Sequence, residues 1–261
     1  MSDTRAFVDG RAAEVDDLIG FARSGYGHFT TLQVRGGAAH ALDLHLTRLQ
    51  DATRVLFDRM LDVEALRENL RRALAGQADA SVRISVVPGN WSARGMPEPA
   101  RIRILMLIDP PAASPQAAVS LRSFAHERYL PRFKHLGSFD LVHLRRQARI
   151  QGFDDAVLRT RDGFLSEGAT FSIGFFRGEA LVWTLAPQLD GITRRLLMQG
   201  ATPPELRALA PTDLRGFDGG FCCHSGGIWP ISRIDDVSLP QDPARIAALR
   251  ARLEAIPRQP I

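Results

Sequence analysis

A proline-rich stretch divides the chain into two halves, each with its own patterns of strands and helices. Three prolines fall within residues 109–116, which are otherwise small or polar. Proline lacks a backbone donor and disrupts the interior of a helix or a central strand, so such a stretch is typical of a linker. The sequence therefore predicts a small N-terminal domain at 1–108, an interdomain linker at 109–116 and a larger C-terminal domain at 117–261.

The first half combines strand and helix patterns. Residues 27–35 are expected to form a strand. Within them, one set of side chains alternates with another: Phe29, Thr31, Gln33 and Arg35 with Thr30, Leu32 and Val34. Asp43 is expected to cap a helix that ends near Phe57, and Asp62 a second helix that ends at Gly76. Further strands are expected at 7–8, 81–87 and 101–108.

The second half is richer in short strands separated by turn residues. Helices are expected from Phe139 to about Gln151, near Gly191, and after Asp242, where Pro243 occupies the first helical position. Strands are expected at 117–124, 156–159, 164–166, 171–177, 180–183, 220–224 and 228–234. The two halves together predict an α/β (α+β) protein of two domains, the smaller one N-terminal and the larger one β-rich.

Composition argues against several classes of function. The net charge is +4, but the basic residues are scattered, so no nucleic-acid partner is expected. No run of eighteen apolar residues occurs, so no membrane span is expected. The histidines lack zinc-site spacing, and no metal is expected. The two cysteines, Cys222 and Cys223, are adjacent and are interpreted as small buried side chains of a protein in the reducing cytoplasm.

One residue stands out from this composition. Of the 33 lysines and arginines, one is a lysine, Lys134, and the other 32 are arginine. Arginine can replace lysine as a surface charge, but it cannot replace a primary amine that must attack a carbonyl. Lys134 is therefore a candidate for amine chemistry, although an isolated surface lysine is the simpler alternative.

Several other segments could bind a phosphate group. Gly191, Ile192 and Thr193 at the start of a helix offer backbone N–H groups and a hydroxyl. Ser225 and Gly226 form a second flexible loop with a hydroxyl. Arg48 could supply a guanidinium, though it could equally be a surface residue.

Taken in order, these segments resemble the class IV aminotransferases, which are the fold type IV enzymes that use pyridoxal 5'-phosphate (PLP). The group includes branched-chain and D-amino acid aminotransferases and 4-amino-4-deoxychorismate lyase. The segments that carry the resemblance lie at 27–32, 42–49, 134–136, 152–158, 162–168, 189–194 and 224–231.

The resemblance implies a fold type IV structure with PLP between the domains, and a homodimer. It implies that Lys134 is catalytic and holds PLP as a Schiff base, and that Glu167 pairs with the pyridine nitrogen. The residues that the resemblance places around the cofactor phosphate are Arg48, Gly191, Ile192, Thr193, Ser225 and Gly226. Those that it places in the pocket for a small substrate are Phe29, Thr31, Phe139 and Gly227.

The sequence also departs from the family pattern. Phe139 stands where branched-chain members carry a tyrosine, and Pro88-Gly89 stands where Arg-Gly is common. The reaction expected first is aminotransfer between an amino acid (or amine) and a 2-keto acid. The first alternative is 4-amino-4-deoxychorismate lyase, which forms 4-aminobenzoate and pyruvate. The second is a family member that is non-catalytic or works without PLP.

Overall fold

The computed structural model describes residues 3–23, 25–89, 101–199 and 204–261. Contacts group the chain into two units. The first unit comprises Met1–Ala112, Phe133–Ser138 and Pro257–Ile261. The second unit comprises Ala113–Arg132 and Phe139–Ile256. The two units are thus not continuous in sequence, whereas the predicted domain ranges are, and the segment with Lys134 groups with the first unit.

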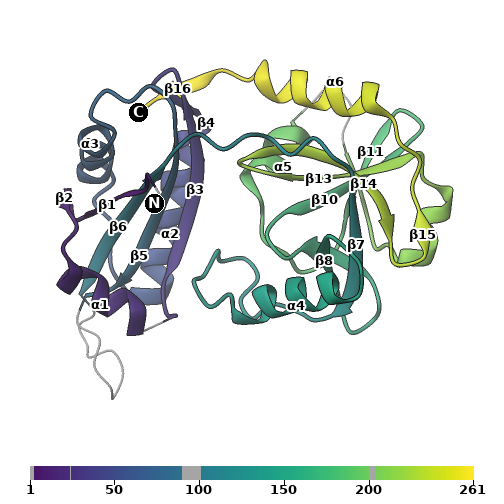
Figure 1. Ribbon diagram of the computed structural model, residues 1–261, viewed down its shortest axis with the longest axis horizontal. Helices are drawn as coiled ribbons and strands as arrows, with labels where there is room; N and C mark the ends of the chain where they lie inside the picture. The colour runs from purple at the N-terminus through teal and green to yellow at the C-terminus, as the bar shows by residue number, and fades with distance from the viewer. Residues whose placement is uncertain (1–2, 24, 90–100, 200–203) are drawn as a thin grey trace. The chain divides into compact units, whose positions relative to one another are not determined.

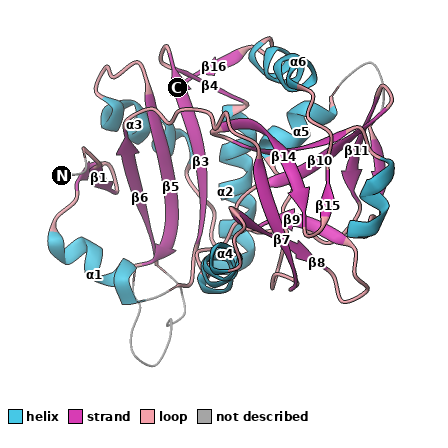
Figure 2. Cartoon of the chain, turned by 45° about the vertical axis from the view of Figure 1, so that its right-hand side comes forward, coloured by secondary structure: helices cyan, strands magenta, loops and turns pink. Residues whose placement is uncertain are grey.

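The first unit contains a seven-stranded antiparallel sheet with the order β16-β4-β3-β5-β6-β1-β2. Figure 2 shows β6, β5 and β3 side by side. The strands are β1 (Arg5–Val8), β2 (Arg11–Ala12), β3 (His28–Arg35), β4 (Ala38–His40), β5 (Ala80–Pro88), β6 (Ile102–Asp109) and β16 (Arg258–Pro260).

Three helices accompany this sheet: α1 (Val15–Arg23), α2 (Leu42–Phe57) and α3 (Val63–Leu74). Figure 1 shows α2 and α3 beside the strands of the first unit. Leucines of both helices, such as Leu46 and Leu66, form one buried cluster with Leu32 of β3 and Ile84 of β5. Because side chains alternate along a strand, the core lies on one face of the sheet and the odd-numbered residues of β3 point to the other face.

Of the two helix caps expected in the first unit, one is confirmed and the other was wrong. The Asp62 carboxylate accepts a hydrogen bond from the Ala65 N–H at 2.9 Å, which confirms it as the cap of α3. The prediction for Asp43 was wrong, because α2 begins at Leu42 and Asp43 lies inside its first turn. The Asp43 carboxylate instead accepts a hydrogen bond from Gln259 Nε2 at 2.7 Å, which ties α2 to β16.

The second unit contains a nine-stranded mixed sheet with the order β12-β11-β10-β13-β14-β7-β8-β9, in which β15 pairs with β14. Its strands are β7 (Val119–Ala125), β8 (Asp155–Arg159), β9 (Leu165–Gly168), β10 (Ser172–Arg177), β11 (Ala180–Thr184), β12 (Glu205–Arg207), β13 (Gly219–His224), β14 (Gly227–Ile234) and β15 (Val237–Ser238). Its helices are α4 (Phe139–Ile150), α5 (Ile192–Met198), the 3-10 helix η1 (Pro211–Gly216) and α6 (Pro243–Glu254). Asp242 accepts a hydrogen bond from the Arg245 N–H at 3.0 Å, which confirms it as the cap of α6. None of the helices described in either unit is both long and apolar enough to cross a bilayer.

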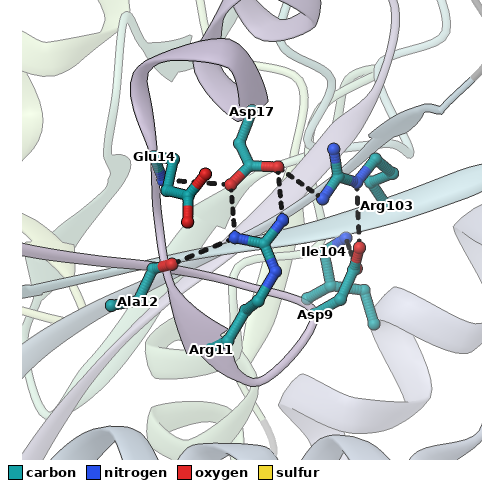
Figure 3. A network of polar contacts seen from close by, with 7 residues as sticks. All are labelled: Asp9, Arg11, Ala12, Glu14, Asp17, Arg103 and Ile104. Carbon is teal, nitrogen blue, oxygen red and sulfur yellow. Dashed lines mark hydrogen bonds and ion pairs between the residues drawn. The ribbon is translucent and has the colours of Figure 1, made fainter.

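A network of charged groups fixes α1 to the sheet of the first unit (Figure 3). The Asp17 carboxylate accepts two hydrogen bonds of 2.7 Å from Arg11 and one of 2.8 Å from Arg103. Asp9 binds the Nε of Arg103 at 2.9 Å and the N–H of Ile104 at the same distance. The hydrogen bonds from Arg11 are the main reason that the pKa of Asp17 lies well below its usual range.

We predict that Asp17→Asn lowers the free energy of unfolding at neutral pH and that this loss shrinks in acid. A carboxyl group whose pKa is depressed on folding stabilises the protein above its ordinary pKa of 3.8, and this contribution disappears as the pH falls toward the lower value of the folded state. Urea unfolding from about pH 7 to about pH 3 would measure the difference. Asp16→Asn, an exposed neighbour in the same helix turn, is the matched control. Equal losses in the two variants at every pH would contradict the assignment.

Candidate active site

Lys134 is held against β3 by its backbone. The Phe29 N–H donates to the Lys134 carbonyl at 2.9 Å, and the Leu136 N–H donates to the Gly27 carbonyl at 2.9 Å. His28 and His135 form an antiparallel bridge between these two bonds. The segment 133–138 therefore pairs for a short stretch with the start of β3, although the linker lies between this segment and β3 in the sequence.

Gly27 is required at this contact. Its φ is +147°, and a Cβ atom at this position would lie 2.6 Å from the Val86 carbonyl oxygen and 2.9 Å from a methyl carbon of Leu136. No other residue fits without displacing one of these neighbours. The glycine that begins the family-like motif at 27–32 thus lets the lysine segment approach β3.

The side chain of Lys134 lies close to Phe29, and its charge acts on His45, which is on the same helix as Arg48. Its Nζ is 4.8 Å from the centre of the Phe29 ring. The pKa of the buried His45 is lowered to about 3, first by burial and then by the positive charges of Arg48 and Lys134. Both cations are therefore close enough to His45 to interact with it electrostatically, and the first unit contains Phe29, Arg48 and Lys134. Thr31 lies on the same strand face as Phe29.

Two histidines fasten α2, which carries Arg48, to β3. The Nδ1 of His45 and the Thr30 hydroxyl are 2.6 Å apart. The Nε2 of His28 and the Thr53 hydroxyl are 3.0 Å apart, and burial lowers the pKa of His28 to about 4. Both imidazoles are thus neutral at physiological pH, so they can join the helix and the strand without placing a further charge beside Lys134.

Glu167 lies in the second unit as a buried carboxylate with two donors on one oxygen. Arg128 Nη1 is 3.0 Å from Oε1, and both side chains are less than a tenth exposed. The Leu189 N–H donates to the same oxygen at 3.1 Å. These contacts fix the orientation of the carboxylate, and they join the segment of Glu167 to the segment that leads into α5.

The predicted phosphate-binding segments lie near one another at one end of the second unit's sheet. Gly191 precedes α5, and a Cβ atom there would be 2.7 Å from the Ser172 hydroxyl. Ser172 of β10 pairs with Cys223 of β13, two residues before Ser225. Ile192 and Thr193 begin α5 and are buried. The second unit therefore brings Gly191 to Thr193 and the turn at 225–227 to the same strand ends.

The turn at 225–227 is tightly built. The Gly226 N–H donates to His224 Nδ1 at 2.9 Å. Gly227 has a φ of +135°, and a Cβ atom on it would overlap the Ser114 side chain. Backbone this close to its neighbours needs glycine, which also lets a bound group approach the main chain.

Phe139, which was expected in the substrate pocket, is not part of either group of predicted site residues described above. It begins α4, its side chain is 79% exposed, and its ring stacks on His143 with 6.0 Å between the centres. The two cysteines are buried and free, in agreement with the sequence, and burial raises the pKa of the Cys223 thiol to about 12. No group of three or more residues able to hold a metal ion occurs in the parts of the chain that the structure describes.

Two residues of these clusters were not identified from the sequence. Arg128 is one of 32 arginines, and no spacing distinguishes it from the others. Ser172 falls within the strand expected at 171–177, and its position near Gly191 follows from the tertiary fold. Neither residue gives a signal that local sequence patterns could detect.

Comparisons with known proteins identify the family of the chain. The family model described as "Amino-transferase class IV" matches residues 27–234. The chain belongs to the class IV aminotransferase family. This confirms the resemblance drawn from the sequence, and the family is one of PLP-dependent enzymes that act on small molecules. A search of curated proteins finds no match to the chain.

Solved structures of this class IV aminotransferase fold are similar along almost the whole chain. A 4-amino-4-deoxychorismate lyase from Pseudomonas aeruginosa is 27% identical, with 95% of this chain and 98% of that chain covered and a TM-score of 0.79. A branched-chain aminotransferase from Thermoproteus uzoniensis is 18% identical, with coverage of 96% and 93% and a TM-score of 0.85. A hypothetical aminotransferase from Mycobacterium tuberculosis in a PLP-bound form is 20% identical, with coverage of 97% and 98% and a TM-score of 0.79. The predicted α/β fold of the fold type IV enzymes is thereby confirmed.

We predict that Arg128→Met destabilises the protein by about 3–5 kcal/mol, because it leaves the Glu167 carboxylate buried without its cation. The double variant Arg128→Met/Glu167→Gln should lose less than the sum of the two single variants, since the two groups depend on each other. Urea unfolding would measure all three. Arg71→Met, which removes exposed contacts with Glu68 and with the Ile261 carbonyl, is the control and should cost at most about 1 kcal/mol. Strict additivity of the two buried changes would be evidence against a coupled pair.

Proposed function

We propose that this chain is a PLP-dependent aminotransferase that moves an amino group between an amino acid (or amine) and a 2-keto acid. The observation that carries the proposal is the position of its only lysine. The Lys134 amine lies 4.8 Å from the Phe29 ring, and its charge and that of Arg48 both lower the pKa of the buried His45. An amine that can bond to an aldehyde and a guanidinium that can bind a phosphate are thus available in one unit.

The residues present fit PLP. Lys134 would hold the cofactor through its amine, and Arg48 would bind the phosphate together with the backbone at 191–193 and 225–226. Gly191 and Gly226 are suited to these close-packed turns, because a Cβ atom on either would meet a neighbouring side chain at 2.7 Å. Glu167 would pair with the ring nitrogen. When bound, PLP supplies the electron sink that stabilises a carbanion.

The chain's own residues would then handle the protons. The Lys134 amine would take a proton from the reacting carbon of the substrate and return it to the cofactor carbon. Glu167 would keep the ring nitrogen protonated, and Arg128 and the Leu189 N–H orient its carboxylate for that task. Phe29 and Thr31 would border the substrate.

The second candidate is 4-amino-4-deoxychorismate lyase. The lyase from Pseudomonas aeruginosa is 27% identical to this chain, compared with 18% and 20% for the two aminotransferases reported above. The residues Phe29-Thr30-Thr31 and Lys134-His135-Leu136 also occur in the lyases that the chain resembles. The same lysine would in that case expel pyruvate from the substrate.

We predict that the purified protein takes up PLP and absorbs visible light, and that Lys134→Ala abolishes this absorption. Lys134→Arg is the matched control, because it keeps a positive charge but lacks a primary amine, and it should be colourless too. Absorption spectra after dialysis against PLP provide the measurement. A coloured Lys134→Arg protein, or a colourless wild type, would argue for the non-catalytic alternative.

The two reactions differ in their need for an acceptor. We expect the enzyme, given an amino acid and no keto acid, to stop after one half-reaction per active site and to resume when a keto acid is added. Chromatography of the products in both conditions would follow this. Formation of 4-aminobenzoate from aminodeoxychorismate without any keto acid would establish the second candidate instead.

A further inference from the structure

The guanidinium of Arg250 in α6 joins three parts of the second unit. Its Nε donates to the Ile228 carbonyl of β14 at 2.8 Å. Its Nη1 donates to the side-chain oxygen of Gln116 at 2.7 Å, and its Nη2 donates to the Pro115 carbonyl at 2.9 Å. Because a guanidinium is planar and rigid, these bonds fix α6, β14 and the linker residues 115–116 relative to one another.

The acceptor on β14 lies one residue beyond the turn at 225–227. The pairing of β13 with β14 ends at positions 224 and 227, so residues 225–226 are a two-residue hairpin loop. Ile228 follows this turn, and its side chain shares a buried cluster with Leu249 of α6, which lies alongside the sheet (Figure 1). Apolar packing and the hydrogen bond from Arg250 thus hold the base of the loop against α6.

The acceptors in the linker hold Ser114 against the same turn. Gln116 Nε2 donates to the Ser114 carbonyl at 2.9 Å, while the side-chain oxygen of Gln116 accepts from Arg250. A Cβ atom on Gly227 would overlap the Ser114 side chain, so the main chain of Gly227 is in direct contact with this serine. Arg250 therefore constrains the turn from two sides, through Ile228 and through the linker.

The turn needs such constraints from outside. It consists of Ser225, Gly226 and Gly227, and glycine fixes the backbone less than any other residue does. A loop whose hydroxyl and N–H groups are already oriented binds an anion at a smaller cost in entropy than a loop that must be ordered first. The contacts of Arg250 are suited to supply that order.

We propose that Arg250 is a positioning residue for the cofactor phosphate, because it fixes the hairpin loop at 225–226 in the conformation that binds this group. The proposal rests on the proposed function, in which the loop contacts the phosphate. Each of the three guanidinium nitrogens already donates to a protein acceptor, so Arg250 acts through the loop. Its role thus differs from that of Arg48, whose guanidinium would bind the phosphate itself.

The test compares PLP with pyridoxal, which lacks the phosphate, as ligands of wild type, Arg250→Gln and Arg250→Lys. Absorption titrations of the cofactor-free proteins give both dissociation constants. We expect Arg250→Gln to weaken PLP binding by about 10- to 100-fold, the loss of one contact to a charged group, and pyridoxal binding by less than about twofold. Arg250→Lys should lie between wild type and Arg250→Gln, because an ammonium group keeps the charge but cannot reach all three acceptors at once.

Arg245→Gln is the matched control. Arg245 lies in the same helix and donates to the Gly178 carbonyl at 3.0 Å, at the turn between β10 and β11, where no site residue is predicted. This variant should bind PLP and pyridoxal as wild type does. Urea unfolding of every variant separates a loss of affinity from a loss of the fold.

A second variant reaches the turn from the linker. Gln116→Ala removes an exposed side chain, so the fold should persist, but it breaks the connection from Arg250 to Ser114. We expect a loss of PLP affinity of about threefold, with pyridoxal unaffected. The double variant with Arg250→Gln should lose no more PLP affinity than Arg250→Gln alone, because both changes break the same connection.

Unchanged PLP affinity in Arg250→Gln would overturn the proposal, as would equal losses of PLP and pyridoxal or the same loss in Arg245→Gln. If Arg250→Gln does not fold, unchanged PLP affinity in Gln116→Ala would overturn it instead. Each of these results leaves the proposed function intact, because wild type still binds PLP. A wild type that takes up neither PLP nor pyridoxal would refute the proposed function itself.

Discussion

Two backbone hydrogen bonds hold the lysine segment against the start of β3, and the arrangement of the first unit's reactive groups depends on them. They join Lys134 and Leu136 to Phe29 and Gly27. Because the bonds are made by the main chain, they bring the backbone of Lys134 beside that of Phe29 without relying on the side chains of the segment. The condition is a glycine at position 27, where any Cβ atom would collide with β5 or with Leu136.

Arginines at different places in the fold differ in whether an acidic side chain lies beside them. Arg11 and Arg103 share the Asp17 carboxylate and fasten α1 to the sheet. In the second unit, the buried pair of Arg128 and Glu167 is completed by a backbone N–H. Arg83, by contrast, has an aromatic ring and no acid among the described residues. The paired charges in both units thus hold separate segments of the scaffold together.

Local chemistry explains which parts of the fold the sequence predicted. Asp62 and Asp242 cap helices because a carboxylate needs only the N–H groups of the next turn. Asp43 has the same side chain, but Gln259 and Arg67, both remote in sequence, bind it instead. The short strands β4 and β16 were likewise missed, because they exist through their pairing with each other and with β3.

By itself, the sequence determined the family and the single residue able to supply a primary amine, because motifs and residue types are properties of the chain alone. Only the tertiary structure distinguished Arg83 and Arg128 from the other arginines. The role of a guanidinium depends on whether an acid, a ring or water lies beside it, and strand register and burial decide that neighbour. Thirty-two arginines look alike in the sequence, and their surroundings make them different.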